Sequence, residues 1–215
     1  MKKLISSEYT FAVDHAHTMS FYDKRGELVK KNKKIFKFVD TSAKVDELVR
    51  LASSEEEEIQ GYFSPEDFST RLHDLNQRSN FYEHSAEFSK NIITSLGLEG
   101  YIEKARFTIN LTIEIDKDIR DFMEDKGFIV KLPNDLIPMR INLRTPFLNP
   151  DNENVYALSI QEMTLDDKHV NIDLTNILPK DELESEKNLL DKEFYHKHFT
   201  ELEQLLTKLN LVEEL

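Results

Sequence analysis

The sequence predicts an α+β fold: an antiparallel sheet of about five to seven strands, with helices packed on one face and a long C-terminal helix. Three observations support this class. Apolar and polar residues alternate in several segments, prolines and short turns separate the later segments, and a leucine-rich stretch closes the chain. Fourteen phenylalanines supply enough apolar surface for a core, although 32% of the residues are charged.

The first element is predicted to be a β-hairpin over residues 8–40. Most odd positions from Tyr9 to Phe21 are apolar, and this period of two indicates a strand with one buried face. Residues 23–26 have turn chemistry, and residues 27–39 are expected to form the returning strand. Lysines between positions 24 and 37 would then protect an edge strand.

A helical segment is predicted over residues 42–97. Thr41 or Ser42 can cap a short helix that runs through Ala52, and four consecutive glutamates over 55–58 indicate a solvated loop. Ser64 followed by Pro65 has the pattern of a second helix start. The apolar side chains that follow fall into two helical stripes, and Gly97 is expected to end the second helix. The stripes consist of Phe68, Leu72 and Leu75, and of Phe81, Phe88, Ile92 and Leu96.

Antiparallel strands are predicted over residues 105–176. The clearest strand covers 105–115, where five apolar residues alternate with polar ones. A short helix is expected over 116–126, and Gly127 would close it. Further strands are expected at the ranges 128–132, 139–145, 155–163 and 169–175.

Residues 179–215 are predicted to form a C-terminal amphipathic helix beside an α+β body at 1–178. Pro179 would open this helix, which would run to about Leu209. Roughly 30 residues at ~1.5 Å per residue exceed the span of a small domain, so part of the helix should overhang. A leucine stripe is not normally left in water, which predicts a protein partner or self-association through this helix. The predicted interaction residues are Leu190, Phe194, Leu202, Leu205, Leu206 and Leu209.

Composition limits the compartment and the chemistry. The chain has no cysteine, so disulfides, thiolate nucleophiles and thiolate metal ligands are excluded. The basic N-terminus reaches Glu8 before an apolar run develops, and no apolar stretch is long enough to cross a bilayer. We therefore expect a cytoplasmic protein with no membrane contact.

The charge of the chain is unevenly distributed. Residues 1–40 carry nine Lys and Arg against five Asp and Glu, a net of +4, which leaves −17 for the remainder of a chain whose total is −13. The overall negative charge makes direct nucleic-acid binding an unfavoured interpretation. The negative charge is also compatible with an acidic inhibitor that imitates nucleic acid and binds to a nucleic-acid-binding protein.

A candidate metal site is the cluster of Asp14, His15 and His17. The two histidines are two residues apart on a predicted strand, so their side chains leave the same face and could bind one divalent metal. A third ligand would come from the glutamates and histidine at 83–87, or from His169. The competing interpretation is that both histidines are structural members of a half-buried sheet.

No catalytic motif accompanies these features. The five glycines form neither a phosphate-binding loop nor a dinucleotide fingerprint, and there is no serine-hydrolase elbow. We therefore expect a non-enzymatic interaction protein without a cofactor, namely a regulator, inhibitor, adaptor or chaperone-like module. The alternatives are a metal-dependent hydrolase that uses Asp14, His15 and His17 with a divalent metal, and the acidic nucleic-acid mimic.

Overall fold

The computed structural model describes residues 3–16, 21–40, 49–53, 58–116, 118–128, 142–149, 154–162, 168–183 and 186–212. The chain divides into two compact units. Unit 1 contains residues 1–7, 108–176 and 201–215, and unit 2 contains residues 8–107 and 177–200.

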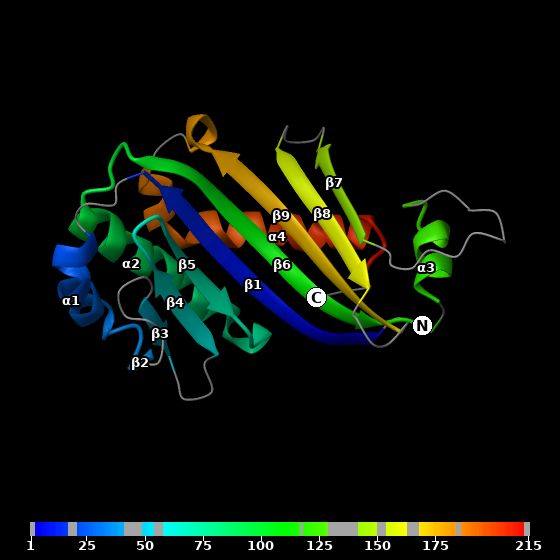
Figure 1. The fold of residues 1–215 in the computed structure, drawn as a ribbon, viewed down its shortest axis with the longest axis horizontal. Coiled ribbons are helices and arrows are strands. Elements are labelled where there is room, and N and C mark those ends of the chain that lie inside the picture. The colour runs from blue at the N-terminus through cyan, green and yellow to red at the C-terminus, as the bar shows by residue number, and fades with distance from the viewer. Residues whose placement is uncertain are drawn as a thin grey trace. The chain divides into compact units, whose positions relative to one another are not determined.

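The described strands form one antiparallel sheet of nine strands in the order β2-β3-β4-β5-β1-β6-β9-β8-β7 (Figure 1). The α+β class and the antiparallel arrangement are thus confirmed, whereas the expected five to seven strands are too few. The excess arises because three strands lie in the segment that the sequence predicts to be helical. The strands are β1 (Lys3–His15), β2 (Phe38–Asp40), β3 (Val49–Ala52), β4 (Ile59–Phe63), β5 (Asp67–Leu72), β6 (Ile102–Glu114), β7 (Asn142–Leu148), β8 (Val155–Glu162) and β9 (His169–Pro179). The helices are α1 (Phe21–Asn32), α2 (Arg78–Leu96), α3 (Ile119–Asp125) and α4 (Lys192–Lys208).

The predicted N-terminal hairpin over 8–40 is wrong. β1 is a strand as expected, but it pairs with β5, with Tyr9 opposite Leu72 and Asp14 opposite Asp67, and its other neighbour is β6. The expected returning strand is largely helix α1, which buries Phe21, Leu28 and Asn32. These three residues are spaced by seven and then four positions, which places them on one side of a helix. The buried positions therefore follow the period of a helix and not the two-residue period of a strand.

The helical segment predicted over 42–97 is also partly wrong. Residues 49–52 form β3 where the first helix was expected to end, and the start of that helix lies outside the described residues. Ser64 caps a β-turn between β4 and β5, because its Oγ accepts hydrogen bonds from the backbone of Glu66 at 3.3 Å and Asp67 at 3.1 Å. β5 then buries every second residue. By contrast, α2 is confirmed, and Gly97 ends it at φ 67°.

Unit 2 has an aromatic core between the apolar face of the sheet and two helices. Phe11 of β1 and Phe107 of β6 lie 5.0 Å apart between ring centroids, and both contact Tyr195 of α4. On β5, Phe68 contacts Phe88 of α2. These three strand positions are fully buried, while the residues before and after each of them are half-exposed. The other face of these strands is therefore polar.

Gly61 of β4 is required by a close aromatic contact. A Cβ atom at this position would lie 2.8 Å from two ring carbons of Phe36, which is fully buried. We expect Gly61→Ala to lower the free energy of unfolding by about 1–3 kcal/mol, the usual cost of overpacking a core. Urea denaturation measures this difference.

Gly26 provides the matched control for that substitution. It lies in α1, and a Cβ atom there would meet nothing within 4 Å. Gly26→Ala should stabilise the protein by about 0.5–1 kcal/mol through helix propensity. Equal effects of the two substitutions would contradict the close contact between Gly61 and Phe36.

Unit 1 repeats the one-sided burial pattern. In its part of β6, and in β9 as far as Thr175, buried apolar residues alternate with half-exposed polar ones. β7 and β8 form a hairpin in which Arg144 is opposite Ser159 and Leu148 is opposite Val155. The strands predicted at 155–163 and 169–175 are therefore present as β8 and β9, and β7 covers the end of the one predicted at 139–145. The strand predicted at 128–132 lies almost wholly outside the described residues.

The C-terminal helix is shorter than predicted. Pro179 ends β9, and short 3₁₀ turns at 180–182 and 186–190 precede α4, which has 17 residues. The fixed φ of proline and its missing N–H suit a strand end as well as a helix start, which explains the error. In the described part of the chain, no helix has the length and apolarity needed to span a bilayer.

Candidate functional site

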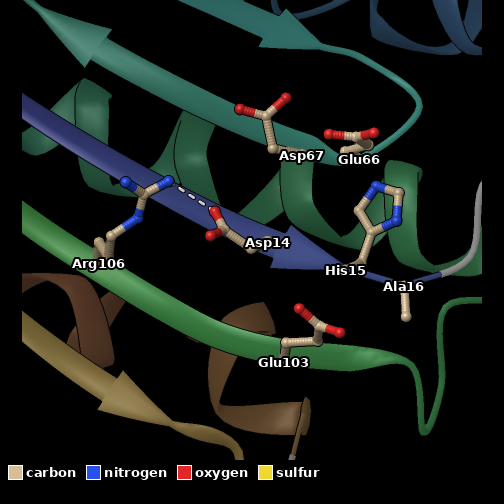
Figure 2. A pocket seen from close by; sticks show the side chains of 7 residues that line it. All are labelled: Asp14, His15, Ala16, Glu66, Asp67, Glu103 and Arg106. Carbon is tan, nitrogen blue, oxygen red and sulfur yellow. Dashed lines mark hydrogen bonds and ion pairs between the residues drawn. The ribbon is translucent and has the colours of Figure 1, made fainter.

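The polar face of unit 2 contains the position of the predicted metal site. A hollow of about 510 Å³ lies at the end of β1 (Figure 2). Asp14 and His15 come from β1, Glu66 and Asp67 from the β4–β5 turn and the start of β5, and Glu103 and Arg106 from β6. The lining residues are Asp14, His15, Ala16, Glu66, Asp67, Glu103 and Arg106.

Asp14 is held by two cations. Its Oδ1 accepts a hydrogen bond from Arg106 at 2.6 Å, and its Oδ2 lies 3.0 Å from the Nζ of Lys104. Both carboxylate oxygens therefore have a positively charged partner. A metal ion would have to displace these cations in order to bind Asp14.

His15 is a member of the core side of β1. Its side chain is 4% exposed and its ring lies 6.4 Å from that of Phe68. Successive side chains of a strand point to opposite faces, which explains why His15 is buried while Asp14 is half-exposed. His17 lies outside the described residues.

Within the described residues, no three His, Cys, Asp or Glu side chains converge in a way that could hold a metal ion. The structure thus brings Asp14 and His15 to one hollow without making them ligands of a common ion. The suggested third ligands at 83–87 belong to α2, and His169 belongs to β9. The metal site stays a prediction that depends on His17.

Three of the six predicted interaction residues at the C-terminus are core residues. Leu202 and Leu206 are fully buried, and Leu205 is 8% exposed. Phe194 and Leu209 are half-buried, and Leu190 is 38% exposed. Part of the apolar stripe of α4 therefore packs inside the protein, and association through the C-terminal helix stays a prediction.

A second group on the polar face of unit 2 was not found by sequence reasoning. The ring of Tyr62 on β4 lies between two guanidinium groups, with Arg50 at 5.9 Å and Arg71 at 5.3 Å from its centroid. Arg50 pairs with Tyr62 in the β3–β4 register, and Gln60 pairs with Arg71 in the β4–β5 register. Cation–π attraction stabilises this arrangement. We call Arg50, Tyr62 and Arg71 the Arg-Tyr-Arg stack.

Glu8 fixes one end of the Arg-Tyr-Arg stack. Its Oε1 lies 3.2 Å from the Nε of Arg71, and its Oε2 lies 3.0 Å from the Nδ1 of His73. The same Oε1 accepts a hydrogen bond from Thr10 at 3.2 Å. Glu8 of β1 thus orients Arg71 in the absence of a bound partner. All three of its side chains are half-exposed.

His84 makes the stability of the protein depend on pH. Burial lowers the pKa of His84 on α2, while Glu83 and Glu87 oppose this shift. The unfolded chain therefore binds a proton more readily than the folded one below the ordinary pKa of about 6.5. We expect the free energy of unfolding to fall as the pH drops through this value, and His84→Leu to reduce the slope. Urea denaturation at several pH values measures it.

The parent protein, measured over the same pH range, is the reference for this dependence. An unchanged slope in His84→Leu would show that burial of His84 does not contribute to the acid sensitivity.

A second hollow, of about 410 Å³, lies on the polar face of unit 1. Four strands line it, namely β6, β9, β8 and β7. Its two charged side chains are Arg144 and Asp173, and the others are hydroxyl, amide or methyl groups.

Comparison with known proteins adds no candidate residue: neither a protein-family model nor a curated protein matches this chain.

Proposed function

We propose that this protein is a non-enzymatic interaction protein, a regulator, inhibitor, adaptor or chaperone-like module, that binds a protein partner on the polar face of unit 2. The observation that carries the proposal is the Arg-Tyr-Arg stack. Arginine and tyrosine are enriched among the residues that dominate binding energy at protein interfaces. The proposal places the protein in the cytoplasm, a compartment that suits a chain without cysteine.

Preorganisation supports a binding role for this face. Strand register fixes the positions of Arg50, Tyr62 and Arg71, and Glu8 restrains Arg71. Side chains that are already ordered lose less conformational entropy when a partner binds. In unit 2, α2 and α4 contact the opposite, apolar face of the strands. They therefore leave the polar face available.

The two alternatives have less support. The metal-dependent hydrolase requires Asp14 as a ligand, and its two oxygens already bind Lys104 and Arg106. The nucleic-acid mimic rests on the net charge of the chain alone, and it predicts a partner that is released steeply by salt. The proposed interface mixes charge with an aromatic ring, so its binding should depend on salt only moderately.

The test uses a partner protein that is captured with the tagged protein and then purified. We expect Tyr62→Ala and the double substitution Arg50→Ala, Arg71→Ala each to weaken its binding by at least tenfold, as truncation of a central interface residue commonly does. Calorimetric titration gives the dissociation constants. Lys90→Ala on the exposed side of α2 is the control and should bind like the parent. Parental affinity in all variants would refute the proposed surface.

A further inference from the structure

The hollow in unit 1 has the size of a small-molecule site. Its volume of about 410 Å³ lies within the range of about 300–1,000 Å³ that is typical of ligand pockets. The side chains of Thr108, Ala157 and Thr175 are short, which leaves space above the sheet between longer neighbours. The lining residues are Thr108, Arg144, Ala157, Ser159, Gln161, Asp173 and Thr175.

The polar groups of this hollow are ordered by one another. The hydroxyls of Thr108 and Thr175 are hydrogen-bonded at 2.9 Å, and the Nε2 of Gln161 donates to the Oγ of Ser159 at 3.2 Å. Each group keeps further hydrogen-bonding capacity, since a hydroxyl has one donor and two acceptor positions and an amide has both kinds. The lining can therefore hydrogen-bond a polar ligand without rearrangement.

The two charged residues of the hollow have opposite signs and come from different strands. Arg144 belongs to β7 and Asp173 to β9, and β8 lies between them. Neighbouring strands are about 4.8 Å apart, so these two backbones are separated by about 10 Å. Both side chains border the hollow, so one ligand in it can reach a guanidinium and a carboxylate.

The charges also differ in their present contacts. Arg144 is exposed and has no carboxylate partner in the part of the chain that the structure describes. Asp173 accepts a hydrogen bond from the amide of Asn110, which orients the carboxylate and leaves its second oxygen for another donor. The hollow thus presents one guanidinium and one carboxylate, and it carries no net charge.

We propose that this hollow binds a small zwitterion of the free α-amino acid class, with the ligand carboxylate on Arg144 and the ligand ammonium on Asp173. The guanidinium fork matches a carboxylate with two parallel hydrogen bonds. An anion without the ammonium would face Asp173 and a protein of net charge −13, and a simple cation would face Arg144. This site is independent of the proposed protein interface, which belongs to unit 2.

The experiment is a calorimetric titration of the full chain with each of the twenty free amino acids. At least one should bind, and its N-acetyl and C-amide derivatives, which lack the ammonium and the carboxylate charge respectively, should each bind at least tenfold more weakly. Arg144→Gln and Asp173→Asn should weaken binding to a similar degree. Lys168→Gln and Asp121→Asn make the same charge changes at exposed positions outside the hollow and should bind like the parent.

Two results would overturn the site. Binding of none of the twenty amino acids excludes the ligand class, and equal binding of the derivatives excludes recognition of both charges. These measurements use the unsubstituted protein, so they hold even where Asp173→Asn disturbs the contact with Asn110. The thermal midpoint of each variant shows whether its fold is retained.

Discussion

Leu206→Ala should lower the free energy of unfolding by about 2–5 kcal/mol, which is the usual cost of removing a buried leucine side chain from a core. Leu206 is fully buried in α4, as is Leu202 one turn earlier. The substitution leaves a cavity that its surroundings fill only in part. Urea denaturation measures the loss, and it should not depend on protein concentration.

Leu190→Ala is the control for this substitution, because Leu190 comes from the same leucine-rich segment but is 38% exposed. Its effect should stay below about 1 kcal/mol, since less apolar surface is returned to water. If Leu206 instead formed an interface between two copies, Leu206→Ala would change the mass in solution and make stability concentration-dependent. That outcome would support association through the C-terminal helix and would contradict the burial of Leu206 in the core.

Tyr195→Phe should lower the free energy of unfolding by about 1–3 kcal/mol, the usual penalty for leaving buried polar partners unsatisfied. The Tyr195 hydroxyl is hydrogen-bonded to Ser89 at 2.7 Å and donates to the carbonyl of Leu189 at 2.8 Å. The side chain is fully buried, and this burial raises the pKa of the phenol far above its ordinary value. Tyr195 therefore stays neutral and acts as a link between α2 and the chain before α4.

Tyr22→Phe is the control. Tyr22 lies on α1 and is 60% exposed, so its hydroxyl can bind water in both the folded and the unfolded state. Its removal should change the free energy of unfolding by less than about 0.5 kcal/mol, the usual range for a surface substitution. A loss in Tyr195→Phe as small as that in Tyr22→Phe would show that the contacts with Ser89 and Leu189 contribute little stability.

The parts of the fold that the sequence predicts correctly have an unambiguous period. β6 alternates apolar and polar residues over more than ten positions, and the second stripe of α2 ends at a left-handed glycine. In β5, by contrast, Phe68 and Leu72 are four residues apart, a spacing that fits one helical turn and two strand repeats equally well. Ser64 adds to the error, because a hydroxyl that caps a helix can also cap a turn.

The Arg-Tyr-Arg stack could not be predicted from the sequence for a different reason. Arg50, Tyr62 and Arg71 lie on three strands, and only the pairing of β3, β4 and β5 brings them together. The sequence therefore shows two arginines and a tyrosine with no fixed spacing. Likewise, the leucines of α4 indicate a buried face, but only the packed structure shows that this face is covered by the chain itself.

Photo-crosslinking from two positions tests the proposed interface most directly. A photoreactive amino acid replaces either Ser69, which pairs with Tyr62 on the polar face, or exposed Thr207 on α4. In the protein's native cell we expect a single defined adduct from position 69, its loss when Arg50→Glu and Arg71→Glu are added, and no adduct from position 207. An adduct from position 207 alone, or one from position 69 that survives both charge reversals, would contradict the assignment of partner binding to the Arg-Tyr-Arg stack.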